Sequence, residues 1–227
     1  MLARRTLLGT AALAPLWGQA ASDASNQTLR AAPVDINALP APGTYKLARI
    51  NSAPTGAVLD TQARTHQLNA LLRGRISIVS FIYTYCRDPE GCPQAWAALE
   101  QLRDSLGKDE LLAKRAQIVS ISFDPSNDTP QTMRLFAGAY ATDPRVRWQF
   151  LTTASVPALL PLLDGFGQDV SVEMGTDGKP ARTLNHLLKL FLVDARLQVR
   201  EIYSIATLAP QALLNDMQTL RMEESRA

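Results

Sequence analysis

Apolar runs of strand length alternate with segments of helical period along most of this chain, and this alternation limits the fold more than any other feature. The runs expected as strands are residues 75–83, 116–123, 146–151, 187–193 and 199–203. Helices are expected over residues 93–107, 128–140, 155–166 and from 210 onward. The resulting order, β-α-β-α-β-α-β-β-α, predicts an α/β fold with a mixed sheet and helices on both faces.

Proline and small polar residues mark the expected helix starts. Pro93 suits the first turn of a helix that follows the first strand, and Asp128 is expected to cap the helix that begins near Pro130. Asp124 precedes Pro125 and is expected in a turn. The alternative for Asp124 and Asp128 is a functional role, in which their carboxylates assist metal or proton transfer. Trp96, three residues into the helix after Pro93, is expected to have a packing role and no function of its own.

The chain has two cysteines, Cys86 and Cys92, and both fall between the first expected strand and its helix. A helix N-terminus lowers the pKa of a nearby thiol, which favours reactive or metal-binding thiolates. Pro89 and Gly91 are expected to turn the loop so that the two sulfurs come within reach of a disulfide or a shared metal. A structural disulfide is common in exported proteins. Closing so short a loop contributes only about 2 kcal/mol, however, which is small beside the burial in a domain of this size.

The first 20 residues have the order of a cleavable export signal. Arg4 and Arg5 precede an apolar stretch from Leu7 to Trp17, and Gly18-Gln19-Ala20 provides small residues for cleavage. This apolar core is roughly half of the ~20 residues that a membrane span needs. We therefore predict a signal peptide over 1–20 and a periplasmic location, with no stable membrane span after cleavage. The arginine pair is also compatible with a twin-arginine signal.

Composition separates the rest of the chain into a tether, one domain and a tail. Residues 21–44 are small, polar and proline-containing, which predicts a flexible tether. A single domain over 45–221 is long enough for a full core at 46% hydrophobic residues, and 222–227 form a tail. The chain has 23 basic and 21 acidic residues, and the two signal arginines account for the difference. A nucleic-acid partner is therefore not expected.

Several motifs together connect this pattern to a known family. A strand followed by a cysteine loop at a helix N-terminus, with a terminal β-β-α, is the thioredoxin arrangement. Between Leu59 and Leu220 the chain also carries Phe81-Ile82-Tyr83-Thr84, Cys92-Pro93, the run from Ser122 to Pro130, and His186 before Phe191-Leu192-Val193-Asp194. In this order the motifs resemble the SCO/SenC copper chaperones, which implies a thioredoxin-like fold.

The resemblance implies a copper site, for Cu(I) or Cu(II), made by Cys86, Cys92 and His186. It implies a function in copper delivery to, or preparation of, the copper site of a respiratory metalloprotein, with a cytochrome oxidase copper subunit as the client. Soft Cu(I) prefers thiolate ligands, and an imidazole can complete such a site. The alternative is a thiol:disulfide oxidoreductase with Cys86 and Cys92 as catalytic residues. A metallochaperone is favoured over an enzyme because an oxidoreductase has no need of His186.

Two departures from the family pattern affect the expected site. Five residues separate the cysteines where the family usually has three, and Asn185 stands before the histidine where an acid is common. His66 lies in a polar segment and is expected to be exposed on the surface. His186, at the start of an apolar strand, would by itself be more typical of a structural histidine. A thioredoxin proper is disfavoured because no Trp-Cys-x-x-Cys is present, and a peroxidase is disfavoured by the position of Thr84.

Overall fold

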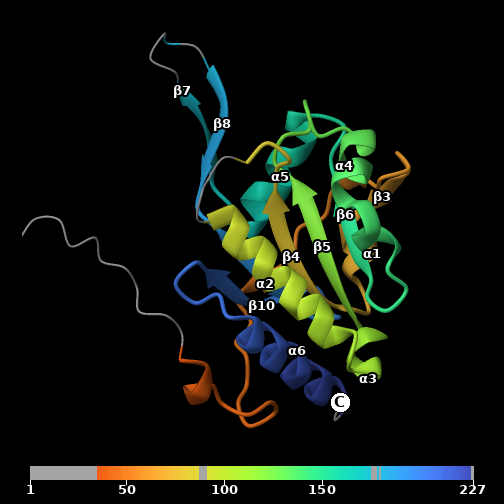
Figure 1. Ribbon diagram of the computed structural model, residues 1–227, viewed down its shortest axis with the longest axis vertical. Coiled ribbons are helices and arrows are strands. Elements are labelled where there is room, and N and C mark those ends of the chain that lie inside the picture. The colour runs from red at the N-terminus through yellow and green to blue at the C-terminus, as the bar shows by residue number, and fades with distance from the viewer. Residues whose placement is uncertain (1–34, 87–90, 175–177, 179, 226–227) are drawn as a thin grey trace, which may run out of the picture. The chain divides into compact units, whose positions relative to one another are not determined.

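The computed structural model describes residues 35–86, 91–174, 178 and 180–225, which all belong to one compact unit (Figure 1). The predicted signal, tether residues 21–34, Pro89 and the last two residues lie outside the described residues. Within the described part of the chain, no helix has the length and apolar character needed to cross a membrane.

A six-stranded mixed sheet forms the centre of the molecule, in the order β1-β10-β9-β4-β5-β6. Its strands are β1 (Asn51–Ser52), β4 (Ile76–Ile82), β5 (Ala116–Ser122), β6 (Trp148–Leu151), β9 (Lys189–Val193) and β10 (Gln198–Ser204). β4, β5 and β6 run parallel, whereas β9 pairs antiparallel with both β4 and β10. The predicted antiparallel pair near the C-terminus is therefore confirmed.

Side chains that alternate along β4 pack into two separate cores. Ile76 and Ile78 face one core, and Val79 and Phe81 face the other. The helices of the first core are α2 (Gly91–Leu106), α3 (Glu110–Ala113), α4 (Pro130–Ala137) and α6 (Pro210–Ser225); those of the second are α1 (Leu68–Leu72) and α5 (Val156–Phe166). Because a strand presents successive side chains to opposite faces, a sheet covered on both faces needs this pattern. The predicted α/β fold with helices on both faces is confirmed.

The capping residue of α4 differs from the prediction. Thr129 is the N-cap, and its hydroxyl accepts a hydrogen bond from the Thr132 backbone N–H at 3.2 Å. Asp128 is therefore not the cap, and its side chain is buried instead. Asp124 lies in the expected turn, where its carbonyl accepts hydrogen bonds from the backbones of Asn127 and Asp128.

Several elements lie outside the predicted pattern. They are η1 (Ile36–Ala38), η2 (Gly138–Thr142), the small helices α1 and α3, the edge strand β1, and the two hairpins β2–β3 (Ala57–Leu59, Thr65–Gln67) and β7–β8 (Val170–Met174, Pro180–His186). Figure 1 shows β7 and β8 projecting beyond the rest of the described chain. In the sequence, apolar residues alternate at Val170, Val172 and Met174 and are followed by a glycine-containing segment. This pattern is typical of a β-hairpin and could have predicted the second one.

Residues 40–45 contact α6, although most of them fall in the segment predicted as a tether. Asn215 Nδ2 donates to the Pro40 carbonyl at 3.1 Å, and Gly43 N–H donates to Thr219 Oγ1 at 2.9 Å. The Tyr45 hydroxyl donates to Asp216 at 2.5 Å. The part of the tether nearest the domain is thus held by backbone and side-chain hydrogen bonds. The division of the chain as a whole stays a prediction.

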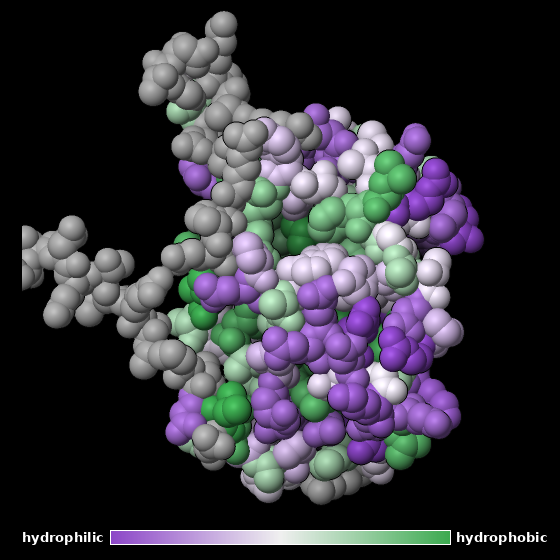
Figure 2. Space-filling view, viewed as in Figure 1, coloured by the Kyte–Doolittle hydropathy of each residue, from purple (hydrophilic) through white to green (hydrophobic). Residues whose placement is uncertain are grey.

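An aromatic cluster fills the core between α2 and β6. Trp96 has ring contacts with Phe136, Tyr140, Trp148 and Phe150, at centroid distances of 5.1–6.3 Å. Trp96 is partly buried and packs against the first core, in agreement with the packing role expected for it. On the face shown in Figure 2, hydrophilic residues predominate and hydrophobic residues form separate patches.

Candidate functional site

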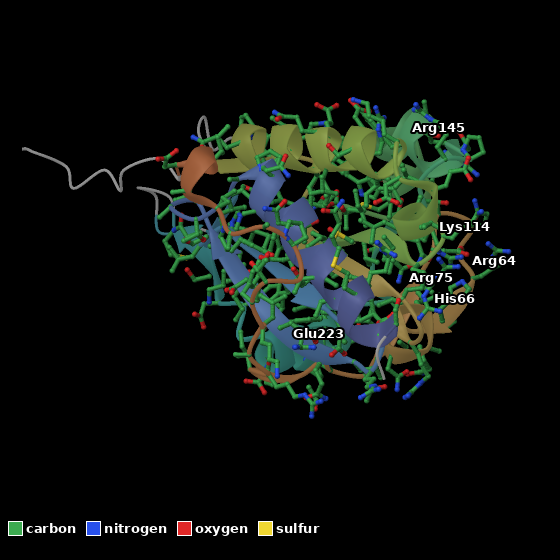
Figure 3. The ribbon with its side chains drawn as sticks, turned by 90° about the horizontal axis from the view of Figure 1, so that it is seen from below. Arg64, His66, Arg75, Lys114, Arg145 and Glu223 are labelled. Atoms are coloured by element: carbon green, nitrogen blue, oxygen red, sulfur yellow. A yellow bond between two sulfur atoms is a disulfide. The ribbon has the colours of Figure 1, made fainter. Side chains whose placement is uncertain are left out.

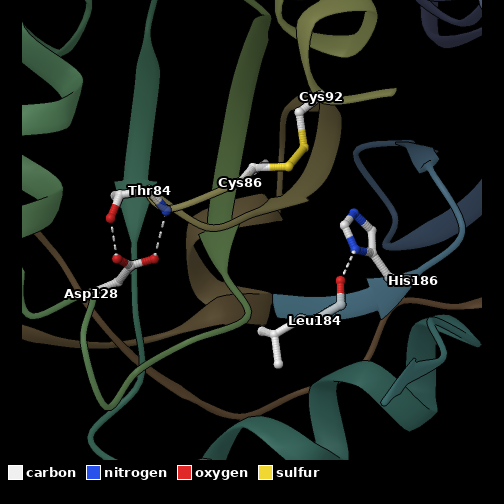
Figure 4. The surroundings of a disulfide bond; sticks show 6 residues. All are labelled: Thr84, Cys86, Cys92, Asp128, Leu184 and His186. Atoms are coloured by element: carbon white, nitrogen blue, oxygen red, sulfur yellow. Dashed lines mark hydrogen bonds between the residues drawn. A yellow bond between two sulfur atoms is a disulfide. The ribbon is translucent and has the colours of Figure 1, made fainter. Parts of the chain in front are cut away.

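The cysteine pair lies where β4 passes into α2. Tyr83 is buried directly after β4, and the Cys86 N–H donates to its carbonyl at 3.3 Å, while Cys92 is the second residue of α2. The two cysteines form a disulfide, with their Cα atoms 6.7 Å apart (Figure 4). The predicted approach of the two sulfurs is therefore confirmed, within the Cα separation of about 7 Å that a disulfide allows.

His186 reaches this place from the end of the β7–β8 hairpin. Its ring packs against Phe123 and Tyr83, with centroid distances of 4.6 and 6.0 Å. Nδ1 lies 3.2 Å from the Leu184 carbonyl oxygen (Figure 4). Because a carbonyl only accepts hydrogen bonds, this contact requires the N–H on Nδ1, and in the neutral ring Nε2 then has the lone pair. A fixed tautomer of this kind is typical of histidines that bind metals through Nε2.

One cavity brings the three predicted site residues together. Its volume is about 440 Å³, and Cys86, Cys92 and His186 all contribute to its lining. Most of the remaining lining is apolar or aromatic: Phe81, Ile82, Tyr83, Pro93, Ala95, Trp96, Leu99, Phe136 and Leu188. An apolar cavity with a few polar groups is the usual form of a binding site.

The two sulfurs are joined, so the structure shows the oxidised form of the pair. In the described part of the chain, no three Cys, His, Asp or Glu side chains lie as a group that could hold a metal ion. A disulfide offers no thiolate, and thiolate is the form of cysteine that binds metals. Reduction would supply two thiolates beside an imidazole nitrogen, a donor set that suits a soft metal ion. The assignment of Cys86, Cys92 and His186 as ligands stays a prediction.

Asp128 supports the cysteine segment, a role that the sequence analysis missed. Its carboxylate accepts hydrogen bonds from the Thr84 N–H at 3.0 Å and the Thr84 hydroxyl at 2.5 Å (Figure 4). The Ser122 hydroxyl donates a third bond at 2.6 Å. An aspartate just before a helix is most often a cap, so the sequence alone contained no signal for this contact.

His66 is absent from the residues that line the cysteine cavity. Its side chain is 32% exposed, and Nε2 lies 2.9 Å from Asp60 Oδ2 within the β2–β3 hairpin. His66 thus lies at the surface but is only partly exposed, because the hairpin turn brings a carboxylate to the ring. Figure 3 shows His66 and Arg64 at one edge of the molecule.

A larger open cleft, of about 850 Å³, is lined by residues near the starts of β4 and β6, including Arg75, Lys114 and Arg147. The side chains of Arg75, Lys114 and Arg145 are labelled in Figure 3. Arg75 donates to the Lys114 carbonyl at 3.3 Å, just after α3 ends. Cations are favoured at helix C-termini, which accounts for a basic lining in this cleft. The smaller cavity, with its cysteines and histidine, is the better candidate for chemistry.

Comparison with known proteins agrees with this geometry. A family model described as SCO1/SenC matches residues 58–221, which is most of the chain. The chain belongs to the SCO1/SenC family. The resemblance seen between Leu59 and Leu220 is thus confirmed, together with the thioredoxin-like fold that it implied.

Individual relatives are distant from this SCO1/SenC protein. A SCO1 protein homolog of Bacillus subtilis (strain 168) is 32% identical over 81 residues, which are 36% of this chain and 39% of that protein. Bradyrhizobium japonicum ScoI, solved with copper bound, has a TM-score of 0.57 at 20% identity, covering 74% of this chain and 98% of its own. BsSco, described as a member of the Sco family of cytochrome c oxidase assembly proteins with a disulfide switch, has a TM-score of 0.58 at 21% identity, covering 78% of this chain and 97% of its own. At these identities the solved structures show the shared fold.

Proposed function

We propose that this protein is a periplasmic copper-binding assembly factor, whose cargo copper is bound by Cys86, Cys92 and His186. The observation that carries the proposal is that all three side chains line one cavity, although the histidine lies about a hundred positions beyond the cysteines in sequence. Membership of the SCO1/SenC family and the copper-bound ScoI relative support it.

The geometry supports a binding site that opens only after reduction. Once the disulfide is reduced, the thiolate of Cys92 lies in the first turn of α2, where the positive end of the helix dipole stabilises it. The hydrogen bond from Nδ1 to Leu184 leaves Nε2 as the imidazole ligand. Two thiolates and one imidazole make a low-coordinate Cu(I) site, which an acceptor protein's ligand can enter.

The client in this proposal is a respiratory copper protein, with the copper subunit of cytochrome oxidase first among the candidates. The description of BsSco as one of the cytochrome c oxidase assembly proteins supports this choice. The predicted signal over residues 1–20 would export the domain to the periplasm. In this proposal the copper site of the client is exposed in the same compartment.

A second function is a thiol:disulfide oxidoreductase that keeps the copper-binding cysteines of the client reduced. The observation that favours it is the formed disulfide between Cys86 and Cys92 next to a cavity. A redox-active pair is expected to open with a modest reductant in the folded protein and to close again on mild oxidation. Mass spectrometry of the alkylated native protein checks this, and a bridge that opens only after unfolding would contradict it.

An anaerobic Cu(I) titration of the reduced domain, in competition with a chromophoric chelator, tests the copper proposal. We expect one copper per chain, and Cys86→Ser or Cys92→Ser should each lower the affinity at least a hundredfold because a thiolate is lost from a site with few ligands. His186→Ala should weaken binding about tenfold or more. His66→Ala is the matched control and should leave the affinity unchanged. Equal effects of the two histidine substitutions would remove His186 from the site.

A further inference from the structure

Asp128 is a charged side chain in the interior whose role the copper site does not explain. It is 1% exposed and lies immediately before the N-cap of α4. Burial of a carboxylate is costly unless hydrogen bonds replace its water. The three donors described above supply those bonds, and the nearby N-terminus of α4 favours negative charge.

Two of the three donors belong to Thr84, which lies two residues before Cys86. The third donor, Ser122, ends β5 and pairs in register with Ile82 at the end of β4. Asp128 thus connects the ends of the neighbouring strands β4 and β5 and holds the chain at the point where it leaves β4 for the cysteine. In the same segment the Cys86 N–H donates to the Tyr83 carbonyl.

We propose that Asp128 is a positioning residue that, through Thr84, holds Cys86 where it can pair with Cys92. The inference rests on the proposed function only in taking these cysteines as the reacting pair. In the oxidised protein the disulfide itself keeps Cys86 in place. In the reduced protein the disulfide no longer holds Cys86, and its position then depends on the two hydrogen bonds from Thr84 to Asp128.

The consequence concerns the balance between disulfide and dithiol. When a small dithiol reduces the protein, the S–S bond of the protein breaks, the reductant closes its own disulfide, and two electrons and two protons pass to Cys86 and Cys92. Without the Asp128 bonds, the reduced segment gains conformational freedom while the oxidised one stays tied. The dithiol is then favoured, and the disulfide becomes easier to reduce.

The test is the equilibrium of the full domain with dithiothreitol in its reduced and oxidised forms, without copper, read by alkylation and mass spectrometry. Asp128→Asn should shift the equilibrium constant about tenfold toward the dithiol, which is about 30 mV. Thr84→Val removes the hydroxyl donor alone and should shift it the same way by a smaller factor. Thr84→Ser keeps both donors and should match the unsubstituted protein. If Asp128→Asn does not fold, the comparison of Thr84→Val with Thr84→Ser tests the inference by itself.

Asp216 is the matched control for a purely structural effect. It is also a buried carboxylate, it lies on α6, and it accepts hydrogen bonds from the Tyr45 and Tyr203 hydroxyls. Asp216→Asn should lower the stability of the fold without changing the dithiol equilibrium. An unchanged equilibrium in Thr84→Val, or an equal shift in Asp216→Asn, would overturn the inference. Because no copper is present, either result is separate from the titration that tests the copper site.

Discussion

At the scale of single residues, Asp60 shows how hydrogen bonds outweigh the burial of a charge. Burial alone would raise the pKa of this carboxyl, but hydrogen bonds from His66, from Arg64 and from the Gln62 backbone lower it to about 2. Four bonds of 2.8–3.0 Å converge on its two oxygens in the turn of the β2–β3 hairpin. The carboxylate is therefore a structural part of this turn.

A pH-dependent contribution to stability follows from that lowered pKa. The folded state favours ionised Asp60, so its contribution is complete above the ordinary carboxyl pKa of about 4 and is lost as the pH falls toward about 2. Asp60→Asn should lower the free energy of unfolding at pH 7, and the difference from the unsubstituted protein should shrink between about pH 4 and pH 2. Urea denaturation across this range measures it.

Asp169→Asn serves as the control for Asp60. The side chain of Asp169 is 93% exposed, and its distance to Lys189 Nζ is 3.8 Å. Exposed pairs of this kind contribute little to stability. The free energy of unfolding of Asp169→Asn should differ little from that of the unsubstituted protein at every pH. If Asp60→Asn instead lowered the free energy of unfolding by the same amount at pH 7 and at pH 2, the prediction would be contradicted.

Residue roles could be predicted from the sequence where one chemical explanation excluded the others. Cys86, Cys92 and His186 were predictable as neighbours because the family motif carries all three. Asp128 and Thr129 are adjacent and both are good caps, so the sequence could not tell which one turns inward. That choice depends on Thr84 and Ser122, which approach Asp128 only in the folded sheet.

At the scale of elements, helix α5 packs unusually close to the chain before β2. A Cβ atom on Gly165 would lie 2.4 Å from Pro54 Cβ and 3.5 Å from Pro54 Cα. Glycine in a helix normally costs about 1 kcal/mol relative to alanine. Here the absence of a side chain allows the contact between the helix and the proline ring.

Gly165→Ala is therefore expected to destabilise the fold. Overpacking costs typically 1–3 kcal/mol, which exceeds the gain of about 1 kcal/mol in helix propensity. Because the proline ring is fixed to its backbone, it cannot move aside without moving the chain. Gly107→Ala is the control, since its added Cβ would meet its neighbours at 3.5–3.8 Å, which is ordinary contact. Chemical denaturation of both variants checks the prediction, and an equal or greater stability of Gly165→Ala would contradict it.

The elements that were predictable from sequence are those that bury a face in one of the two cores. β4, β5, β9 and the long helices fall in this group, because burial imposes a period on their apolar residues. The β7–β8 hairpin is different. Val172 and Met174 are exposed on it, so its alternation follows from pairing between the two strands and not from a buried face. This hairpin nevertheless carries His186, and the geometry of the site depends on it.

At the scale of the whole molecule, two cores make the fold largely independent of its disulfide. Closing the loop between Cys86 and Cys92 contributes about 2 kcal/mol by the chain-entropy relation. We expect the domain to stay folded in reductant, with a midpoint of thermal unfolding lower by about 4–8 °C. Calorimetry with and without reductant measures this change. The Cys86→Ser/Cys92→Ser variant should match the reduced protein, and complete unfolding on reduction would instead indicate a structural bridge.

The aromatic cluster beside the cavity provides the protein with an optical reporter. Of its three tryptophans, Trp17 lies in the predicted signal, and Trp96 and Trp148 are in ring contact at 5.1 Å. In a protein without residues 1–20, all indole emission therefore comes from one cluster, and Trp96 shares the cavity lining with both cysteines. A disulfide quenches an excited indole by accepting its electron, as does Cu(II). Emission should rise when the bridge opens and, under the proposed copper site, fall when Cu(II) binds; fluorescence of the unlabelled protein measures both changes.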